Sequence, residues 1–161
     1  MTMPILYIIN MHKKFFLGVL NILTLCLVIG VVSISLIGGS PWSGLILISL
    51  SFLCLASLLP FKISLKSVQP DILFGFIDNG VLAILAIFGG HFAGVTGAIL
   101  GGIVGNAITD GIAGIFEGYS AERLRLKIIS EERTMLKSAV GKMAGCLLGA
   151  GMVMLASHFI L

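Results

Sequence analysis

Charged residues are scarce in this sequence of 161 residues. Only 11% of the residues are charged, whereas 58% are hydrophobic, and the mean hydropathy is +1.15. A soluble domain carries about 25% charged residues, and so few charges cannot coat the water-exposed surface of a chain of this size. The composition therefore excludes a soluble enzyme, a secreted disulfide scaffold and a nucleic-acid-binding protein. It indicates an integral membrane protein.

Cysteine is also rare. The sequence has three cysteines, Cys26, Cys54 and Cys146, and no C-x-x-C pair, so it indicates neither a disulfide framework nor a zinc knuckle. The sequence also lacks an H-E-x-x-H motif, a G-x-S-x-G motif and a glycine-rich phosphate loop. Its three histidines are scattered along the chain. We therefore predict no enzymatic activity and no permanently bound cofactor.

Apolar residues occur in blocks that are long enough to cross a bilayer. A helix needs roughly 20 apolar residues to cross the hydrocarbon core. The sequence predicts an all-α, polytopic membrane protein with about five transmembrane helices, in a single transmembrane domain that covers residues 1–161. A tight turn at Gly89–His91 is expected between the third helix and the fourth. The predicted spans are residues 15–37, 44–60, 71–88, 92–119 and 138–161.

All ten lysine and arginine residues fall on one side of this layout. They are Lys13, Lys14, Lys62, Lys66, Arg123, Arg125, Lys127, Arg133, Lys137 and Lys142. Loops rich in lysine and arginine stay cytoplasmic, so we expect a cytoplasmic N-terminus and an outside C-terminus. The polar segment 120–137 has three alternative interpretations. It forms an amphipathic cytoplasmic helix, it continues the fourth span out of the membrane, or it is a solvated connector. Because no organelle-targeting segment is evident, we expect a bacterial cytoplasmic membrane.

The predicted first, second and fifth spans contain no acidic residue, whereas the third and fourth spans contain or border four. An ionisable group in a bilayer costs about 2.5–3.5 kcal/mol or more, so it normally faces a bundle interior or an aqueous path. Asp71 and Asp78 are seven residues apart, as are Asp110 and Glu117, so each pair shares a helix face. Neither span contains a lysine or arginine that neutralises them.

Antiparallel packing of these two spans predicts two layers of oxygen ligands. One layer, near the cytoplasmic surface, pairs Asp71 with Glu117, and the other, near mid-membrane, pairs Asp78 with Asp110. Stacked oxygen ligands suit a cation that loses its water stepwise. Alternatively, the acids are protonated or hydrogen-bonded packing residues. The predicted metal ligands are Asp71, Asp78, Asn79, Asn106, Asp110 and Glu117.

Glycine is abundant, with 21 residues in the chain. Gly97, Gly101 and Gly105 repeat every four residues, the pattern that lets two helices approach closely. We expect this stripe to pack against the third span, against the fifth span or against another subunit. The fifth span has glycines at the same spacing: Gly141, Gly145 and Gly149.

Residues 71–125, about a third of the chain, resemble the vacuolar iron transporter family. The segment Asp78-Asn79-Gly80 is similar to the Asp-Gly-containing first helix of that family. The segment Phe116-Glu117-Gly118-Tyr119-Ser120 resembles the Gly-Glu-Tyr-Val-Ser-like motif that ends its second helix. The resemblance implies a homodimer that moves Fe²⁺ or similar metals in exchange for protons. It also implies that Asp78 lines the pathway and that Glu117 lies at its cytoplasmic mouth.

Two functional hypotheses follow from the sequence. The first is a small oligomeric membrane transporter of divalent transition-metal cations, iron-like or manganese-like, in which the carboxylates exchange protons. The metal ion is then the substrate, and the partners are the lipid bilayer and further copies of the chain in a homodimer or higher oligomer. The second is a non-transporting membrane scaffold or assembly subunit that docks a partner through its glycine-rich helix.

Overall fold

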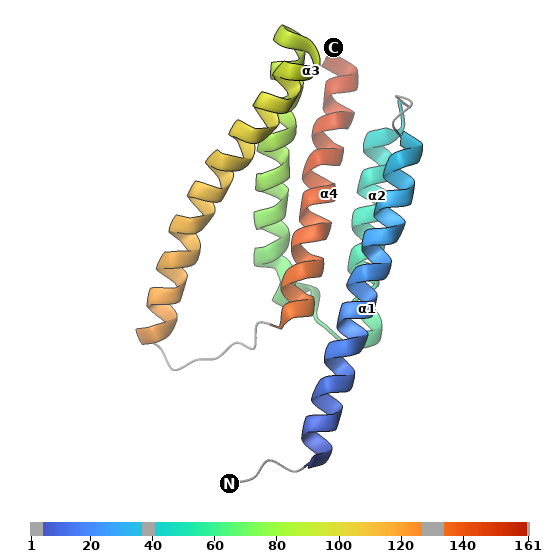
Figure 1. The fold of residues 1–161 in the computed structure, drawn as a ribbon, viewed down its shortest axis with the longest axis vertical. Coiled ribbons are helices and arrows are strands. Elements are labelled where there is room, and N and C mark those ends of the chain that lie inside the picture. Colours follow the sequence, from blue (N-terminus) through green and yellow to red (C-terminus); the bar gives the residue numbers. More distant parts are fainter. Residues whose placement is uncertain (1–4, 37–40, 127–133, 161) are drawn as a thin grey trace. The chain divides into compact units, whose positions relative to one another are not determined.

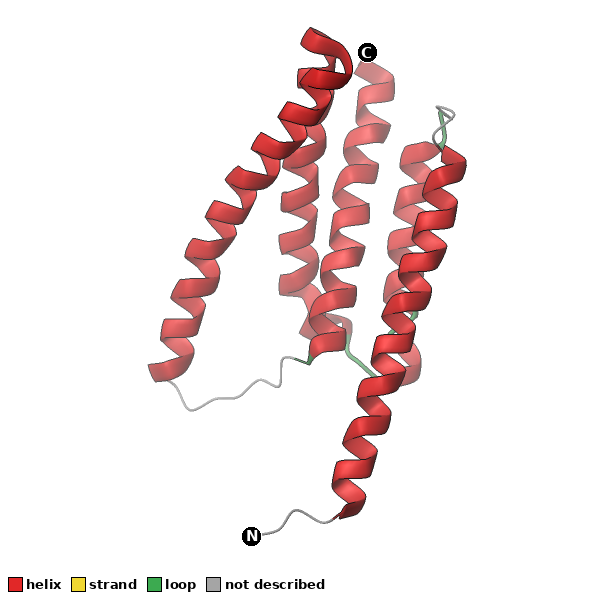
Figure 2. Cartoon of the chain, in the orientation of Figure 1, coloured by secondary structure: helices red, strands yellow, loops and turns green. Residues whose placement is uncertain are grey.

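The computed structural model describes residues 5–36, 41–126 and 134–160. For the helical residues 5–12, 36, 116–126 and 160 it describes the backbone alone. Throughout the described ranges the chain is helical apart from short turns, and these ranges contain no strand (Figures 1 and 2). The predicted all-α class is therefore confirmed. The helices are α1 (Ile5–Leu36), α2 (Ser43–Ala56), the short 3-10 helix η1 (Leu59–Phe61), α3 (Leu65–Leu126) and α4 (Met135–Ile160).

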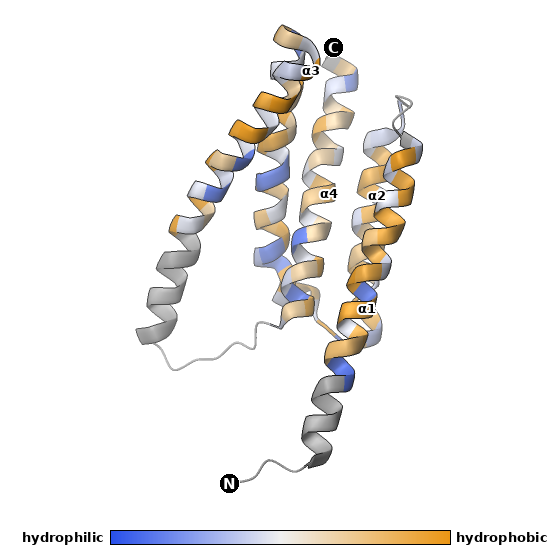
Figure 3. Cartoon of the chain, viewed as in Figure 1, coloured by the Kyte–Doolittle hydropathy of each residue, from blue (hydrophilic) through white to orange (hydrophobic). Residues whose placement is uncertain are grey.

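Within the described part of the chain, four helices are long and apolar enough to cross a membrane. Apolar residues dominate most of the length of these helices in Figure 3, with a few hydrophilic turns in α3 and α4. The chain is therefore a membrane-embedded protein. The qualifying stretches are Lys13–Ser35, Ser43–Phe61, Leu65–Ile115 and Met135–Phe159.

The predicted third and fourth spans both belong to α3, which reverses direction near its middle (Figure 1). Ala93 has φ −135° and ψ 24°, and Gly94 has φ 57° and ψ −140°, so the backbone leaves the helical region at these two residues. Glycine populates positive φ without a steric penalty. We call residues 65–92 the first arm of α3 and residues 95–126 the second arm.

The reversal lies beyond the turn that the sequence predicts at Gly89–His91. Gly89 and Gly90 remain helical and instead face the second arm. A Cβ atom added to Gly89 would overlap the carbonyl oxygen of Gly97, and one added to Gly90 would lie 3.3 Å from the Cβ of Ala98. The predicted turn position is therefore wrong, because this glycine pair serves close helix packing and Gly94 makes the turn.

The glycine stripe of the second arm packs directly on the first arm. A Cβ atom on Gly97 would overlap the carbonyl oxygen of Gly89, and one on Gly101 would overlap that of Leu85. A Cβ atom on Gly105 would lie 2.8 Å from the Cα of Leu82. This confirms the predicted close approach and identifies the first arm, within the predicted third span, as the partner of the stripe.

Helix α4 packs against both α3 and α2. On the α3 side, a Cβ atom on Gly145 would overlap the carbonyl oxygen of Ile72, and one on Gly149 would overlap that of Phe76. Residue numbers rise together along this contact, so α4 runs parallel to the first arm. The glycines of the predicted fifth span therefore also face the predicted third span.

The contact of α4 with α2 is antiparallel. A Cβ atom on Gly44 would lie 2.7 Å from the carbonyl oxygen of Gly151. Further along, the buried Ser51 donates a hydrogen bond of 2.7 Å from its Oγ to the carbonyl oxygen of Ala144. In a bilayer this bond is well shielded from water, so it fixes the register of the two helices.

The helix contacts divide the chain into two units, Met1–Gly38 and Gly39–Leu161. The first unit contains α1. In the second unit, the end of α2 and the starts of α3 and α4 meet around Leu58, Val68 and Val140, which are fully buried.

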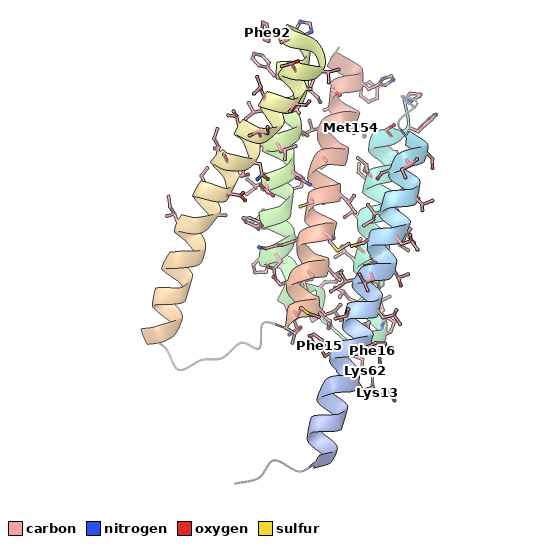
Figure 4. The ribbon with its side chains drawn as sticks, in the orientation of Figure 1. Lys13, Phe15, Phe16, Lys62, Phe92 and Met154 are labelled. Carbon is pink, nitrogen blue, oxygen red and sulfur yellow. The ribbon has the colours of Figure 1, made fainter. Side chains whose placement is uncertain are left out.

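The two ends of the second unit differ in composition. We call the end where α2 finishes the cationic end, since Lys62, Lys66 and Lys137 lie there. We call the opposite end the aromatic end, and the exposed large side chains there include Trp42, Phe88, Phe92 and Phe159. Figure 4 labels Lys62 and Phe92 at these opposite ends. Of the predicted cytoplasmic segment 120–137, residues 120–126 continue α3, and residues 127–133 lie outside the described part.

Candidate functional site in α3

Asp78 joins the two arms of α3. Thr109 of the second arm donates a hydrogen bond from its Oγ1 to Oδ1 of Asp78. The same Oγ1 lies 3.1 Å from the carbonyl oxygens of Gly105 and Asn106. Since a hydroxyl group has a single proton, Asp78 competes with these two carbonyl groups for it. Thr109 is 4% exposed and Asp78 is half-buried, so this contact belongs to the interior of the hairpin.

Thr109 is a residue that the sequence reasoning missed. It follows Gly101 and Gly105 at the same spacing of four residues, so the glycine stripe already placed it on the face that meets the first arm. Because Thr109 occupies that face, Asp110 is turned by about 100° around the helix. Asp78 therefore meets Thr109 and not the predicted layer partner Asp110.

Asp110 and Asn106 form a pair on an exposed side of the second arm, turned away from Thr109. Nδ2 of Asn106 donates a hydrogen bond of 2.8 Å to Oδ2 of Asp110, one helical turn further along. Both side chains are exposed on the surface of the protomer. They lie within Leu65–Ile115, the stretch of α3 that is apolar enough to cross a membrane. The structure thus brings two of the predicted ligands together on an outward-facing surface.

Asp71 contacts the start of α4, and its predicted pairing with Glu117 stays a prediction because the side chain of Glu117 lies outside the described part of the structure. The side chain of Asp71 is 4% exposed, and its Oδ1 accepts a hydrogen bond of 3.0 Å from Oγ of Ser138 at the start of α4. A Cβ atom on Gly141 would lie only 2.8 Å from the Cβ of Asp71, so the backbone of α4 passes directly beside this side chain. Asp71 therefore ties the first arm to α4.

A cation also enters this interface. Nζ of Lys142 lies 4.5 Å from the centroid of the Phe74 ring, which is a cation–π distance. Phe74 lies one turn after Asp71 and one turn before Asp78. Lysine is missing from the predicted third and fourth spans themselves, but α4 supplies one beside them. Sequence reasoning placed Lys142 only among the basic residues beside the fifth span, because it could not show which helix face met α3.

The remaining predicted ligands are Asn79 and Glu117. Asn79 is half-buried on the first arm, next to Asp78. Glu117 lies on the helical backbone of α3, and its side chain is outside the described part of the structure. Its expected position at a cytoplasmic mouth stays a prediction.

The described carboxylates do not gather into one cluster. Among the described residues, no group of three or more histidine, cysteine, aspartate or glutamate side chains is arranged to hold a metal ion. Asp71, Asp78 and Asp110 each accept a hydrogen bond from a different neutral side chain. Two of these bonds join helical segments, whereas the bond to Asp110 lies within one arm. Asp110 is therefore the described carboxylate that faces outward.

Comparison of this chain with protein-family models, curated proteins and solved structures finds no match.

Proposed function

We propose that this protein is a small oligomeric membrane transporter of divalent transition-metal cations, iron-like or manganese-like, with proton exchange at its carboxylates. The observation that carries the proposal is the exposed pair of Asn106 and Asp110 on a helix that is apolar enough to cross a membrane. The choice of metal follows the resemblance of residues 71–125 to the vacuolar iron transporter family.

A carboxylate is costly to place in a bilayer. An aspartate at the centre of a membrane helix costs about 2.5–3.5 kcal/mol on insertion scales. The bond from Asn106 offsets part of this cost. However, one carboxylate oxygen of Asp110 and the side-chain amide oxygen of Asn106 keep free lone pairs. Carboxylate and amide oxygens are ligands for hard and borderline divalent cations. A cation path along this face gives both oxygens a partner.

The proposal includes a membrane layout. The reversal at Gly94 supports two crossings by α3, which gives five crossings in all with α1, α2 and α4. The lysines of the cationic end support a cytoplasmic position for that end. The N-terminus is then cytoplasmic and the C-terminus outside, in what we expect to be a bacterial cytoplasmic membrane.

Uptake of metal into proteoliposomes tests the transport proposal. With a metal-quenched dye inside the vesicles, Asp110→Asn should slow Fe²⁺ or Mn²⁺ uptake by about tenfold or more, since a charged ligand worth at least about 1.4 kcal/mol is lost. Asp110→Glu should retain part of the rate. Ile108→Val, at an exposed apolar position on another side of the same arm, is the control and should leave uptake unchanged. Full uptake by Asp110→Asn would refute the proposal.

One observation favours the scaffold as a second candidate. Every described carboxylate of the predicted site accepts a hydrogen bond from a neutral donor, which is what packing residues do. The stripe from Gly97 to Gly105 is used inside α3, so a docked partner would bind beside the open positions Gly111 and Gly114. Thermal unfolding of the purified protein separates the two candidates. A transporter is stabilised by Fe²⁺ or Mn²⁺ through binding to the folded state, and a scaffold is not.

A further inference from the structure

Helix α4 comes very close to the first arm beside Gly75. A Cβ atom on Gly75 would overlap the carbonyl oxygen of Lys142 and lie 2.8 Å from the backbone nitrogen of Cys146. Gly75 lies one turn after Asp71 and one turn before Asp78, and these two acids are about 10 Å apart along the helix axis. The backbone of Lys142 therefore passes the first arm at a depth between its two aspartates.

The side chain of Lys142 carries its charge to the face that bears both aspartates. Nζ of Lys142 lies 4.5 Å from the centroid of the Phe74 ring. Around the first arm, at about 100° per residue, Phe74 is turned by about 60° from Asp71 and by about 40° from Asp78. This ring belongs to the stretch of α3 that is apolar enough to cross a membrane. The ammonium group is therefore held beside the stretch of helix that separates the two carboxylates.

A neutral donor binds each carboxylate but does not balance its charge. Ser138 donates to Asp71, and Thr109 donates to Asp78. A hydroxyl group satisfies one lone pair of a carboxylate, which offers about four, and it brings no positive charge. Ionised groups within a membrane pair with one another, because an uncompensated charge is costly there. The two aspartates therefore favour a cation between them, and the structure places the ammonium of Lys142 beside them.

We propose that Lys142 is a resident cation: its ammonium occupies, between Asp71 and Asp78, the place that a bound metal ion would otherwise take. The ammonium neutralises one of the two negative charges, and the bonds from the two hydroxyl groups stabilise the other. Since the ammonium is tethered to α4, a dissolved cation must displace it and break a contact between two helices. Lys142 therefore keeps metal ions away from the first arm.

This role of Lys142 narrows the choice of metal ligands. Among the carboxylates that the structure describes in α3, Asp71 and Asp78 then belong to an internal charge cluster. Asp110 is then the described carboxylate that is open to a cation. Lys142 is thus a specificity-determining residue, which decides which acids bind the metal. This consequence rests on the proposed function, whereas the neutralisation of the two aspartates does not.

Reversible unfolding in lipid bicelles tests the neutralisation. Lys142→Met removes the ammonium but keeps a long side chain that packs against Phe74. It should raise the ratio of unfolded to folded protein at least about tenfold, since two carboxylates lose their counter-charge. Lys142→Arg, which keeps the charge, should retain most of the stability. Lys66→Met, at an exposed lysine of the cationic end, is the matched control and should change the ratio by less than about threefold.

The decisive variant combines Lys142→Met with Asp71→Asn and Asp78→Asn. Asparagine still accepts hydrogen bonds from the two hydroxyl groups, so this neutral variant should have a ratio of unfolded to folded protein at least about five times lower than Lys142→Met alone. If Lys142→Met does not fold at all, folding of the neutral variant supports the inference in the same way. A neutral variant as unstable as Lys142→Met would overturn the inference, as would a Lys142→Met variant no less stable than Lys66→Met.

Stabilisation by metal tests the consequence for the site. In thermal unfolding of the detergent-purified protein, Asp78→Asn should retain the shift that Mn²⁺ produces, whereas Asp110→Asn should abolish it. If Asp78→Asn reduces the shift as strongly as Asp110→Asn, metal reaches the first arm past the ammonium, and the inference is overturned. Absence of any Mn²⁺ shift in the original chain would refute only the proposed function, since the bicelle experiment needs no metal.

Discussion

Replacing Thr109 by valine removes the hydroxyl group that joins the two arms of α3 and keeps the branched shape of the side chain. The variant leaves Asp78 without its only described side-chain donor from the second arm. A hydrogen bond to a charged group contributes about 1.5–3 kcal/mol, whereas polar contacts between membrane helices average about 0.6 kcal/mol. Because Thr109 is 4% exposed and water does not replace it easily, we expect a loss near the upper range, about 2 kcal/mol.

The chain offers a matched control for this substitution. Thr24 in α1 donates a hydrogen bond of 2.9 Å from its Oγ1 to the carbonyl oxygen of Leu20, within its own helix, and it is exposed. Since that carbonyl group also belongs to the helix ladder, Thr24→Val should change the free energy of unfolding by no more than about 0.5 kcal/mol. Reversible unfolding in lipid bicelles measures both variants under the same conditions.

A double-mutant cycle isolates the contact from the general effect of removing a hydroxyl group. If Thr109 acts through Asp78, the losses caused by Thr109→Val and Asp78→Ala should not add, and their coupling should be about 1–2 kcal/mol. Additive losses, or a Thr109→Val loss no larger than that of Thr24→Val, would refute the role assigned to this bond.

Two further predictions concern the packing and the depth of the helices. Gly145→Ala should lower the free energy of unfolding by about 2 kcal/mol or more in the same assay, since its methyl group would overlap the carbonyl oxygen of Ile72. Gly111→Ala, which meets nothing within 4 Å, should be neutral or stabilise by up to about 1 kcal/mol, and equal losses would contradict the packing argument. Trp42, the single tryptophan, is 65% exposed at the aromatic end. Its fluorescence should be quenched most by lipids labelled near the headgroups, and strongest quenching by labels at the bilayer centre would contradict this placement.

The helices were predictable because apolar blocks of about 20 residues leave few alternatives. The turn within α3 was not, because two adjacent glycines can make a turn or a close helix contact. Gly89 and Gly90 do the second, and only the structure reveals the positive φ of Gly94. A local signal cannot decide between these uses, since the outcome depends on which helix passes beside it.

The site shows a similar limit. Spacing by seven residues correctly places two side chains on one helix face, but it does not say what that face meets. Asp71 and Asp78 share one face of the first arm but have different partners. At Asp71 the first arm meets Ser138 of α4, and at Asp78 it meets Thr109 of the second arm. Their distribution depends on how far each helix is rotated in its bundle, and that rotation is set by the glycine stripes.

The stability of Asp110 variants links the fold to the proposed function. Asp71 and Asp78 accept hydrogen bonds that join helical segments, so replacing either by alanine should destabilise the chain. Asp110 bonds only within its own arm and faces outward, so Asp110→Ala removes an insertion cost of about 2.5–3.5 kcal/mol and loses one exposed bond.

At protein-to-lipid ratios low enough to give monomers, Asp110→Ala should therefore be at least as stable as the original chain in bicelle unfolding, while its metal uptake is lost. A residue that lowers the stability of the monomer and is needed for activity is typical of functional sites. A destabilised Asp110→Ala monomer would instead make Asp110 a packing residue like the other two, and the scaffold would then be the better explanation.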